Sequence, residues 1–166
     1  MAKPTIRPMS ATDWESVADI YAEGIATGVA TFETEIPSYE VWDRAHMEIC
    51  RLVALNRSKI LGWAALSPVS SRCVYGGVAE VSIYISQSSR GKGIGKQLLS
   101  HLIQASEKEG IWTLQSGVFP TNIASIKVHK AVGFREIGVR ERVGKLKGIW
   151  MDNVLFERRS KVIGVD

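Results

Sequence analysis

The sequence lacks the features of a disulfide-rich, metal-binding or repetitive protein. It has only two cysteines, Cys50 and Cys73, which are too few for a disulfide framework. It contains no Cys-x-x-Cys pair, no His-Glu-x-x-His motif and no other Cys/His ligand spacing, so we expect no metal site. Internal repeats and low-complexity stretches are also missing. These absences leave an ordinary globular chain.

Long apolar runs are absent as well. The longest stretch, Ile60–Leu66, is far shorter than the roughly 20 residues that a membrane-spanning helix needs. The opening segment, MAKPTIRPMS, has no apolar core of the kind found in secretory signal peptides. We therefore expect a soluble, cytoplasmic protein with reduced cysteines and no membrane partner.

Neither sign of charge dominates the sequence. Lysine and arginine total 21 against 17 acidic residues, a net charge of +4, which suits an anionic partner. Proteins that bind nucleic acid usually gather basic residues on one face, with aromatic residues interleaved. Here the basic residues are spread along the chain, apart from one short concentration at 90–96. We therefore expect an anionic small molecule rather than nucleic acid.

The composition indicates one folded domain. Hydrophobic residues make up 45% of the chain and charged residues 23%, as in soluble globular proteins. At roughly 100–200 residues per domain, residues 1–166 are predicted to form a single domain.

Apolar spacing and turn signals predict strands and helices in mixed order. Thr12-x-x-Glu15 is a capping-box pattern. A second helix is expected after Pro37-Ser38, with four residues facing inward: Val41, Trp42, Ala45 and Ile49. The order β-α-α-β-β-β-α-β-α-β-β favours an α/β or α+β sheet with helices on both faces. In chain order we expect a strand at 5–8, helices from about 12 and 39, a hairpin over 52–66, a strand at 78–86, a helix at 93–109, a strand at 112–119, a helix at 124–132, and strands at 134–142 and 149–158.

The most informative segment is the glycine-rich turn RGKGIGK at 90–96, between a predicted strand and a predicted helix. Glycines let the backbone approach a ligand, and a helix N-terminus favours anions, so the turn suits a phosphate or pyrophosphate. It is not a Walker A loop, because Gln97 follows the Gly-Lys pair, nor a dinucleotide fingerprint, because Lys96 occupies the third glycine position. The simpler alternative is a turn with solvated lysines.

The turn matches the pattern Arg/Gln-x-x-Gly-x-Gly/Ala, and further along stands Asn122-x-x-Ser125-x-x-x-His129-x-x-x-Gly133-Phe134. Together these motifs resemble the GNAT superfamily of N-acetyltransferases. The resemblance implies the GNAT fold: a mixed, mostly antiparallel central sheet of about seven strands, helices on both faces, and a V-shaped splay at the strand that binds acetyl-CoA.

Further segments resemble the phosphinothricin N-acetyltransferase branch of that superfamily. They are ATFETE at 30–35, EVSIYI at 80–85, His129 in place of the usual tyrosine, and the C-terminal VGK and GxWxD patterns at 143–152. This branch acetylates the α-amino group of small amino-acid-like substrates, such as phosphinothricin, methionine sulfoximine and methionine sulfone. The resemblance therefore implies acetyl-CoA and a small amine as partners, and a homodimer.

The resemblance also implies roles for single residues. Glu80 would be the base of a direct acetyl transfer, and His129 a second catalytic residue. Acetyl-CoA would be held by Ile83, Tyr84, Ile85, Arg90, Gly91, Lys92, Gly93, Ile94, Gly95, Lys96, Asn122 and Ser125. The substrate would be held by Phe32, Arg72, Tyr75, Ser82 and Tyr84, with Arg72 and Tyr75 at its acidic end. The branch often carries an aromatic or acidic residue just before the glutamate, where this chain has Gly76-Gly77.

The chemistry of the two candidate catalytic residues fits these roles. An amine attacks a thioester only as the free base, so a proton acceptor is needed at neutral pH. Glu80 lies in an apolar strand, where partial burial would raise the pKa of its carboxyl; the alternative is a structural ion pair with an arginine. His129 would assist the base or protonate the departing thiolate, unless it is a core histidine. His46 and His101 are expected at the surface.

Two other functions stay open at this point. One is acetylation of a protein N-terminus or of a polyamine-like amine. The other is a non-catalytic module that binds acyl-CoA, although such a module would not need Glu80 or His129.

Overall fold

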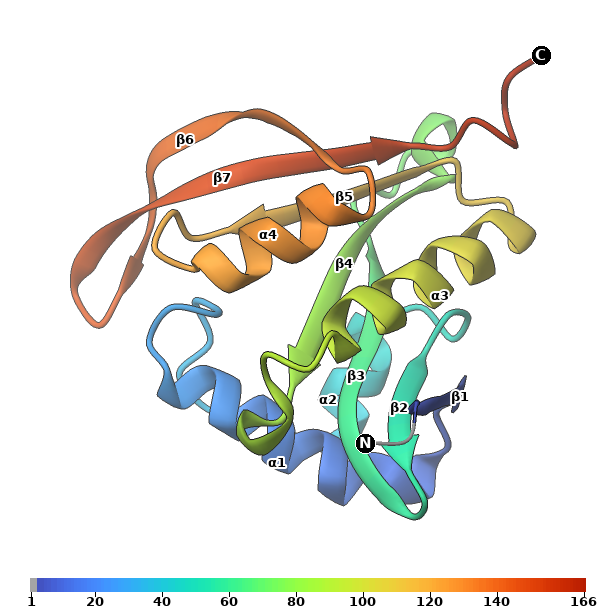
Figure 1. Cartoon of the computed structure of the whole chain (residues 1–166). Helices are drawn as coiled ribbons and strands as arrows, with labels where there is room; N and C mark the ends of the chain where they lie inside the picture. The colour runs from blue at the N-terminus through green and yellow to red at the C-terminus, as the bar shows by residue number, and fades with distance from the viewer. Residues whose placement is uncertain (1–2) are drawn as a thin grey trace.

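Seven strands form one sheet in a computed structural model that describes residues 3–166, in the order β1-β2-β3-β4-β5-β7-β6 (Figure 1). Neighbouring strands are antiparallel except for the parallel pair β4 and β5, which confirms the predicted mixed, mostly antiparallel sheet. The strands are β1 (Thr5–Pro8), β2 (Leu52–Asn56), β3 (Lys59–Pro68), β4 (Val78–Ile85), β5 (Thr113–Val118), β6 (Arg135–Leu146) and β7 (Ile149–Arg159).

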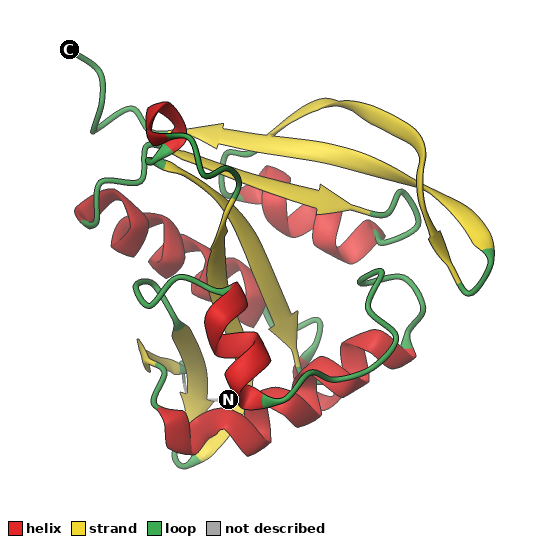
Figure 2. Ribbon diagram, turned by 180° about the vertical axis from the view of Figure 1, so that it is seen from behind, coloured by secondary structure: helices red, strands yellow, loops and turns green. Residues whose placement is uncertain are grey.

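Helices cover both faces of this sheet (Figures 1 and 2). On one face lie α1 (Trp14–Ala26) and α2 (Tyr39–Ala45), and on the other lie α3 (Ile94–Lys108) and α4 (Ile123–Ala131). None of the helices in residues 3–166 has the length and the hydrophobicity required to cross a lipid bilayer. The order of helices and strands is the predicted one.

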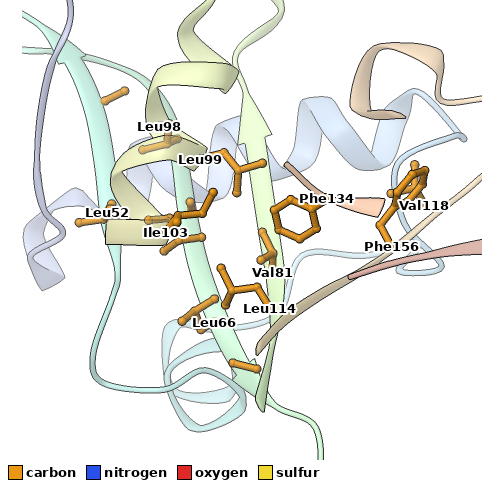
Figure 3. Packing of buried hydrophobic residues seen from close by; sticks show 14 of the residues in the cluster. Leu52, Leu66, Val81, Leu98, Leu99, Ile103, Leu114, Val118, Phe134 and Phe156 are labelled. Atoms are coloured by element: carbon orange, nitrogen blue, oxygen red, sulfur yellow. The ribbon is translucent and has the colours of Figure 1, made fainter. Parts of the chain in front are cut away.

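The core has two parts, one on each side of the sheet. Leu98 and Leu99 of α3 belong to one buried cluster with Leu66, Leu114 and Phe156 (Figure 3). Val17, Trp42 and Trp63 belong to a second cluster on the opposite face. β3 is buried on both faces, which explains why its sequence, Ile60–Leu66, is apolar without alternation.

Two local details of the prediction are wrong. The capping box is formed by Ser10 and Asp13, not by Thr12 and Glu15: the N–H of Ser10 donates to Asp13 Oδ2 (2.8 Å). Asp13 is preferred because it also accepts from Arg7 (2.7 Å), a hydrogen bond that lowers the pKa of Asp13 to about 2. Val41 and Ala45 are exposed, since α2 is short and buries only Trp42. Ile49 lies beyond the end of α2 and is half-buried.

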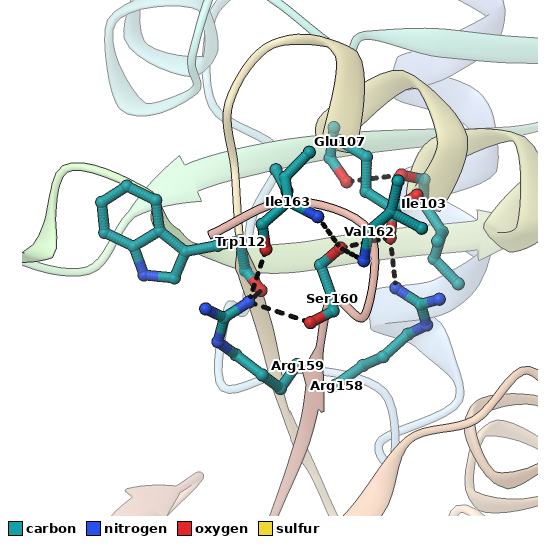
Figure 4. A network of polar contacts seen from close by, with 9 residues as sticks. Ile103, Glu107, Trp112, Arg158, Arg159, Ser160, Val162 and Ile163 are labelled. Atoms are coloured by element: carbon teal, nitrogen blue, oxygen red, sulfur yellow. Dashed lines mark hydrogen bonds and ion pairs between the residues drawn. The ribbon is translucent and has the colours of Figure 1, made fainter. Parts of the chain in front are cut away.

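A polar network joins the end of β7 to the end of α3 (Figure 4). Arg158 and the hydroxyl of Ser160 both donate to Glu107 Oε1, at 3.1 and 2.8 Å. Arg159 donates to the carbonyl oxygens of Ser160, Ile163 and Gly164. The network holds the end of β7 against the end of α3.

The two parallel strands part soon after they meet. β4 pairs with β5 only over Val78–Glu80, whereas it stays paired with β3 as far as Ile85. Beyond Glu80 the side of β4 that faces β5 therefore has no strand partner within the described sheet. This divergence is the predicted V-shaped splay.

Candidate active site

A cleft of about 1240 Å³ opens where β4 and β5 separate. This volume exceeds the usual range for small-molecule pockets, roughly 300–1,000 Å³, so the cleft has room for two ligands together. Its walls come from α1, the α1–α2 loop, α2, the end of β3, β4, the glycine-rich turn and the start of α3, the end of β5, α4, and the strands β6 and β7.

The glycine-rich turn forms one end of the cleft. Gly91 and Gly93 have φ angles of 74° and 75°, a region that L-residues seldom adopt. Gly93 is the N-cap of α3, and its carbonyl accepts the first intrahelical bond, from the N–H of Gln97 (3.2 Å). The N–H groups of the first helical turn are thus left without intrahelical acceptors, which makes this end of the cleft suited to an anion.

Fifteen of the predicted site residues line the cleft: Phe32, Glu80, Ser82, Ile83, Tyr84, Ile85, Arg90, Gly91, Gly93, Ile94, Gly95, Lys96, Asn122, Ser125 and His129. Three do not, within the part of the chain that the structure describes. Lys92 turns its ammonium to the carbonyl of Ser88 (2.7 Å). Arg72 and Tyr75 are exposed, with the guanidinium of Arg72 lying 5.6 Å from the ring centroid of Tyr75.

Gly77, the second of the two glycines before Glu80, has a structural reason. Its carbonyl accepts from the N–H groups of Trp112 (2.8 Å) and Thr113 (3.0 Å). A side chain at Gly77 would collide with the indole ring of Trp112. The glycine thus serves the close approach of the loop to the start of β5.

Glu80 lies on β4 at the point where the strands part, and it is exposed to the cleft. Its Oε2 accepts a hydrogen bond from Gln115 Nε2 (3.1 Å). The partial burial that we expected for Glu80 is wrong, because its carboxylate faces open space rather than the core. No arginine pairs with it among residues 3–166, so the structural ion pair is not found either.

His129 is buried, with 1% of its surface exposed, and it lines the cleft from α4. Its Nδ1 lies 2.7 Å from the carbonyl oxygen of Ser125, and since a carbonyl only accepts, Nδ1 carries the proton. Burial lowers the pKa of His129, so the ring is neutral at pH 7. Its buried Nε2 has no hydrogen-bond partner within the described chain and is left as a free acceptor.

The Asn122…Ser125…His129 motif has a local structural basis. Asn122 is the N-cap of α4, and its side-chain oxygen accepts from the N–H of Ser125 (3.2 Å). Ser125 in turn accepts from His129 one helical turn later. The spacing therefore fixes both the start of α4 and the orientation of the imidazole.

Acidification is expected to destabilise the fold through two histidines, the buried His129 and the half-buried His46. Burial lowers the pKa of both His46 and His129, whereas the unfolded side chains take up a proton near pH 6.5. The free energy of unfolding should thus be constant above about pH 7 and fall as the pH drops below 6.5. Asp13 acts in a separate window, below about pH 4.

Thermal melts between pH 5 and 8 measure this effect. His129→Gln and His46→Gln should each flatten the decline, and His101→Gln, which removes an exposed histidine, should leave it unchanged. A melting temperature that stayed constant between pH 7 and 5 would contradict the prediction.

The chain is similar to known proteins over most of its length. The model of the Acetyltransferase (GNAT) family matches residues 14–134. The chain belongs to the GNAT family of acetyltransferases. It is 35% identical over 162 residues to a phosphinothricin N-acetyltransferase of Alcaligenes faecalis, covering 93% of this chain and 81% of the relative.

Two further proteins agree with this membership. An L-methionine sulfoximine/L-methionine sulfone acetyltransferase of Pseudomonas aeruginosa is 28% identical over 154 residues, covering 89% of this chain and 90% of the relative. A GNAT superfamily phosphinothricin acetyltransferase from Sinorhizobium meliloti, solved in complex with AcCoA, has a TM-score of 0.85 and 33% identity, covering 95% of this chain and 88% of that one. This GNAT protein is thus an acetyl-CoA-dependent acyltransferase, and the predicted branch is confirmed.

In this GNAT protein an aromatic wall closes the cleft on the side of α1. The ring of Tyr84 stacks on Trp63 (centroids 4.9 Å apart) and lies so close to α1 that a Cβ on Gly24 would come within 2.5 Å of it. Burial raises the pKa of Tyr84, which stays a neutral phenol. Phe32, from the α1–α2 loop, packs edge-on against Phe119 at the end of β5 (4.8 Å).

The residues of the GNAT cleft that the sequence analysis missed include His46, Arg140 and Asn153. His46, expected at the surface, is half-buried against the ring of Trp42 (4.4 Å) and lines the cleft. Arg140 and Asn153 reach the cleft from β6 and β7. The alternation of charged residues in β6 gave no sign of which one faces the cleft, because that depends on pairing with distant strands.

Proposed function

We propose that this GNAT enzyme transfers the acetyl group of acetyl-CoA to the α-amino group of a small amino acid or analogue, of the phosphinothricin, methionine sulfoximine or methionine sulfone type. The observation that carries the proposal is the position of Glu80 at the point where β4 and β5 part, a carboxylate that has no ion-pair partner among residues 3–166. The names of the relatives at 28–35% identity support the substrate class.

The cleft fits acetyl-CoA, which supplies an activated acetyl thioester. The N–H groups at the start of α3, with Gly91 and Gly93 and the cations Arg90 and Lys96, would hold the pyrophosphate. The free side of β4 at Ile83–Ile85 would pair with the amides of the pantetheine arm, as an added strand does. Ile94, Gly95, Asn122 and Ser125 line the same half of the cleft, and Lys92 would act only through its charge.

Glu80 would serve as the proton acceptor for the substrate ammonium. Its carboxylate is exposed to the cleft and is oriented by Gln115, so it can take the proton directly or through a water molecule. No covalent bond to the protein is required for this transfer.

His129 would assist the base rather than act as an acid. Its Nδ1–H is engaged by the Ser125 carbonyl and its Nε2 has no proton to give. The free Nε2 would accept a hydrogen bond from the amine or from a water molecule between the amine and Glu80.

The substrate would lie against Phe32, Ser82 and Tyr84, which line the cleft beside Glu80. A role for Arg72 and Tyr75 at the acidic end of the substrate requires that their loop move towards the cleft. The homodimer remains a proposal: β6 is an edge strand, and its exposed Val139, with Ile149 and Trp150 beyond the turn, suits a contact with a second copy.

Release of CoA from acetyl-CoA in the presence of different amines tests the proposed function. The panel would contain phosphinothricin, methionine sulfoximine, methionine sulfone, ordinary amino acids, a peptide and spermidine. Turnover of the first three is the expected result. Turnover of the peptide or spermidine alone would favour a protein or polyamine acetyltransferase, and acetyl-CoA binding without any turnover would favour a non-catalytic module.

A further inference from the structure

The register of the sheet places a cation on the same face as Glu80. Glu80 pairs with Gln115, and Gln115 pairs with Glu157 of β7. Asn153 lies an even number of residues before Glu157, so it points to the same face, and it pairs with Arg140 of β6. Arg140 and Glu80 thus line one cleft from opposite sides.

Arg140 is positioned by a buried amide. Its Nη2 donates to Asn153 Oδ1 (3.3 Å), and Asn153 is only 7% exposed. The amide of Asn153 lies directly over Gly117 of β5, where a Cβ would come within 2.6 Å of Oδ1. Gly117 therefore leaves the space that Asn153 needs to hold the guanidinium.

The charge of Arg140 is not neutralised by a neighbour. Across residues 3–166, none of the ion pairs includes Arg140. Its one side-chain hydrogen bond within residues 3–166, to a neutral amide, leaves the other N–H donors of the planar guanidinium for a ligand. Such a fork matches the paired oxygens of a carboxylate, phosphinate or sulfone.

We propose that Arg140, positioned by Asn153, binds the side-chain oxygens of the acceptor substrate and so selects amino acids that carry a phosphinate or sulfone away from the amine. The proposal rests on the proposed function and assigns the selecting residue within the same cleft. Arg72, the arginine that the sequence suggested for this role, lies outside the cleft lining.

The separation of the strands favours the side-chain oxygens over the α-carboxylate. β4 and β6 are three strand spacings apart, and Arg140 pairs with Asn153, four residues along β7 from Glu157. The backbones of Glu80 and Arg140 are therefore on the order of 20 Å apart. An amine at Glu80 has its α-carboxylate close to it, whereas the oxygens of a phosphinate or sulfone lie several bonds further along the molecule. The remote group is therefore the one that can approach Arg140.

The test compares substrates that differ only in the remote group. For Arg140→Gln, kcat/KM for phosphinothricin should fall by about 10- to 100-fold, since a charge-assisted contact is lost, while kcat/KM for methionine should change little. Asn153→Asp, which sets a carboxylate against Arg140, should lower the preference for phosphinothricin in the same direction. An unchanged Kd for acetyl-CoA would show that both variants fold.

Arg142→Gln is the matched control, because it removes the same charge from β6 at an exposed position outside the cleft lining. It should keep the wild-type preference. The proposal is overturned if Arg140→Gln keeps that preference, or if Arg72→Gln loses it instead. A third outcome also overturns the proposal. Methionine sulfone and its α-carboxamide differ only at the α-carboxylate. If Arg140→Gln changes only the preference between these two compounds, Arg140 binds the α-carboxylate and not the side-chain oxygens.

Binding measurements separate this proposal from the proposed function. If the wild type acetylates none of these amino acids, the proposed function fails. Calorimetric titration of phosphinothricin into the CoA-bound protein then tests whether Arg140 binds the side-chain oxygens. Binding that is lost in Arg140→Gln supports the role of Arg140, whereas binding kept in Arg140→Gln, or missing in the wild type, overturns it.

Discussion

Replacing Glu80 with glutamine is expected to lower kcat for the amine substrate by about 10²- to 10⁴-fold, the usual contribution of a positioned base. Glutamine keeps the size of the side chain and can still contact Gln115, but it accepts no proton. The residual rate should rise with pH, because the free amine then forms without the help of the enzyme. Stopped-flow or steady-state assays of CoA release between pH 6 and 9 measure both effects.

Two controls separate the role of the base from damage to the site. The Kd for acetyl-CoA should be the same in Glu80→Gln and the wild type, since Glu80 lies away from the glycine-rich turn. Glu33→Gln, which removes another carboxylate from the same cleft, should keep most of the activity. A Glu80→Gln variant with more than a tenth of the wild-type kcat would rule out the assigned role.

Replacing Gly93 with valine is expected to raise the Kd for acetyl-CoA on the order of a hundredfold. Gly93 has φ 75°, where a side chain costs about 1–2 kcal/mol and a β-branched residue is an outlier. The backbone would move away from this angle, and the N–H groups at the start of α3 would lose their common direction. Their hydrogen bonds to the pyrophosphate contribute a further amount of comparable size.

Gly110→Val is the matched control for this substitution. Gly110 has nearly the same angle, φ 80°, and likewise open space around it, but it follows the end of α3 rather than its beginning. Both variants should lose thermal stability to a similar degree, and only Gly93→Val should lose affinity in a calorimetric titration. Equal affinities in the two variants would show that the turn does not hold the co-substrate.

The order of the elements was predictable because each depends on a local signal. Ile60–Leu66 is apolar throughout since β3 is buried on both faces, and the glycines at 91 and 93 mark the turn before α3. Helix ends were less certain, because several residues compete as caps. Asp13 and not Glu15 forms the capping box, because Asp13 also accepts a hydrogen bond from Arg7. Arg7 belongs to β1, so this contact cannot be inferred from the sequence of the helix alone.

The part of the candidate site proposed for acetyl-CoA could also be predicted from the sequence. The residues proposed for acetyl-CoA lie in short motifs, at 83–96 and 122–125, and most of them line the cleft. The residues around the acceptor amine come from separate elements, and their arrangement depends on the register of β5, β6 and β7. Arg72 was selected because it matches a position of the branch that the sequence resembles, whereas the strand register that brings Arg140 to the cleft cannot be inferred from the sequence.

The short parallel contact between β4 and β5 has a consequence for the cooperativity of unfolding. Three residue pairs join the strands β1–β4 to β5–β7, so the two parts of the sheet depend on α3, and on Arg158 and Glu107, to unfold together. A ligand whose amide groups pair with β4 adds hydrogen bonds at this junction, the weakest in the sheet. At a hundred times its Kd it would add about 2.7 kcal/mol to the stability of the whole molecule. In amide hydrogen exchange, the two parts of the sheet would then be protected as one unit with the ligand bound, and to different degrees without it.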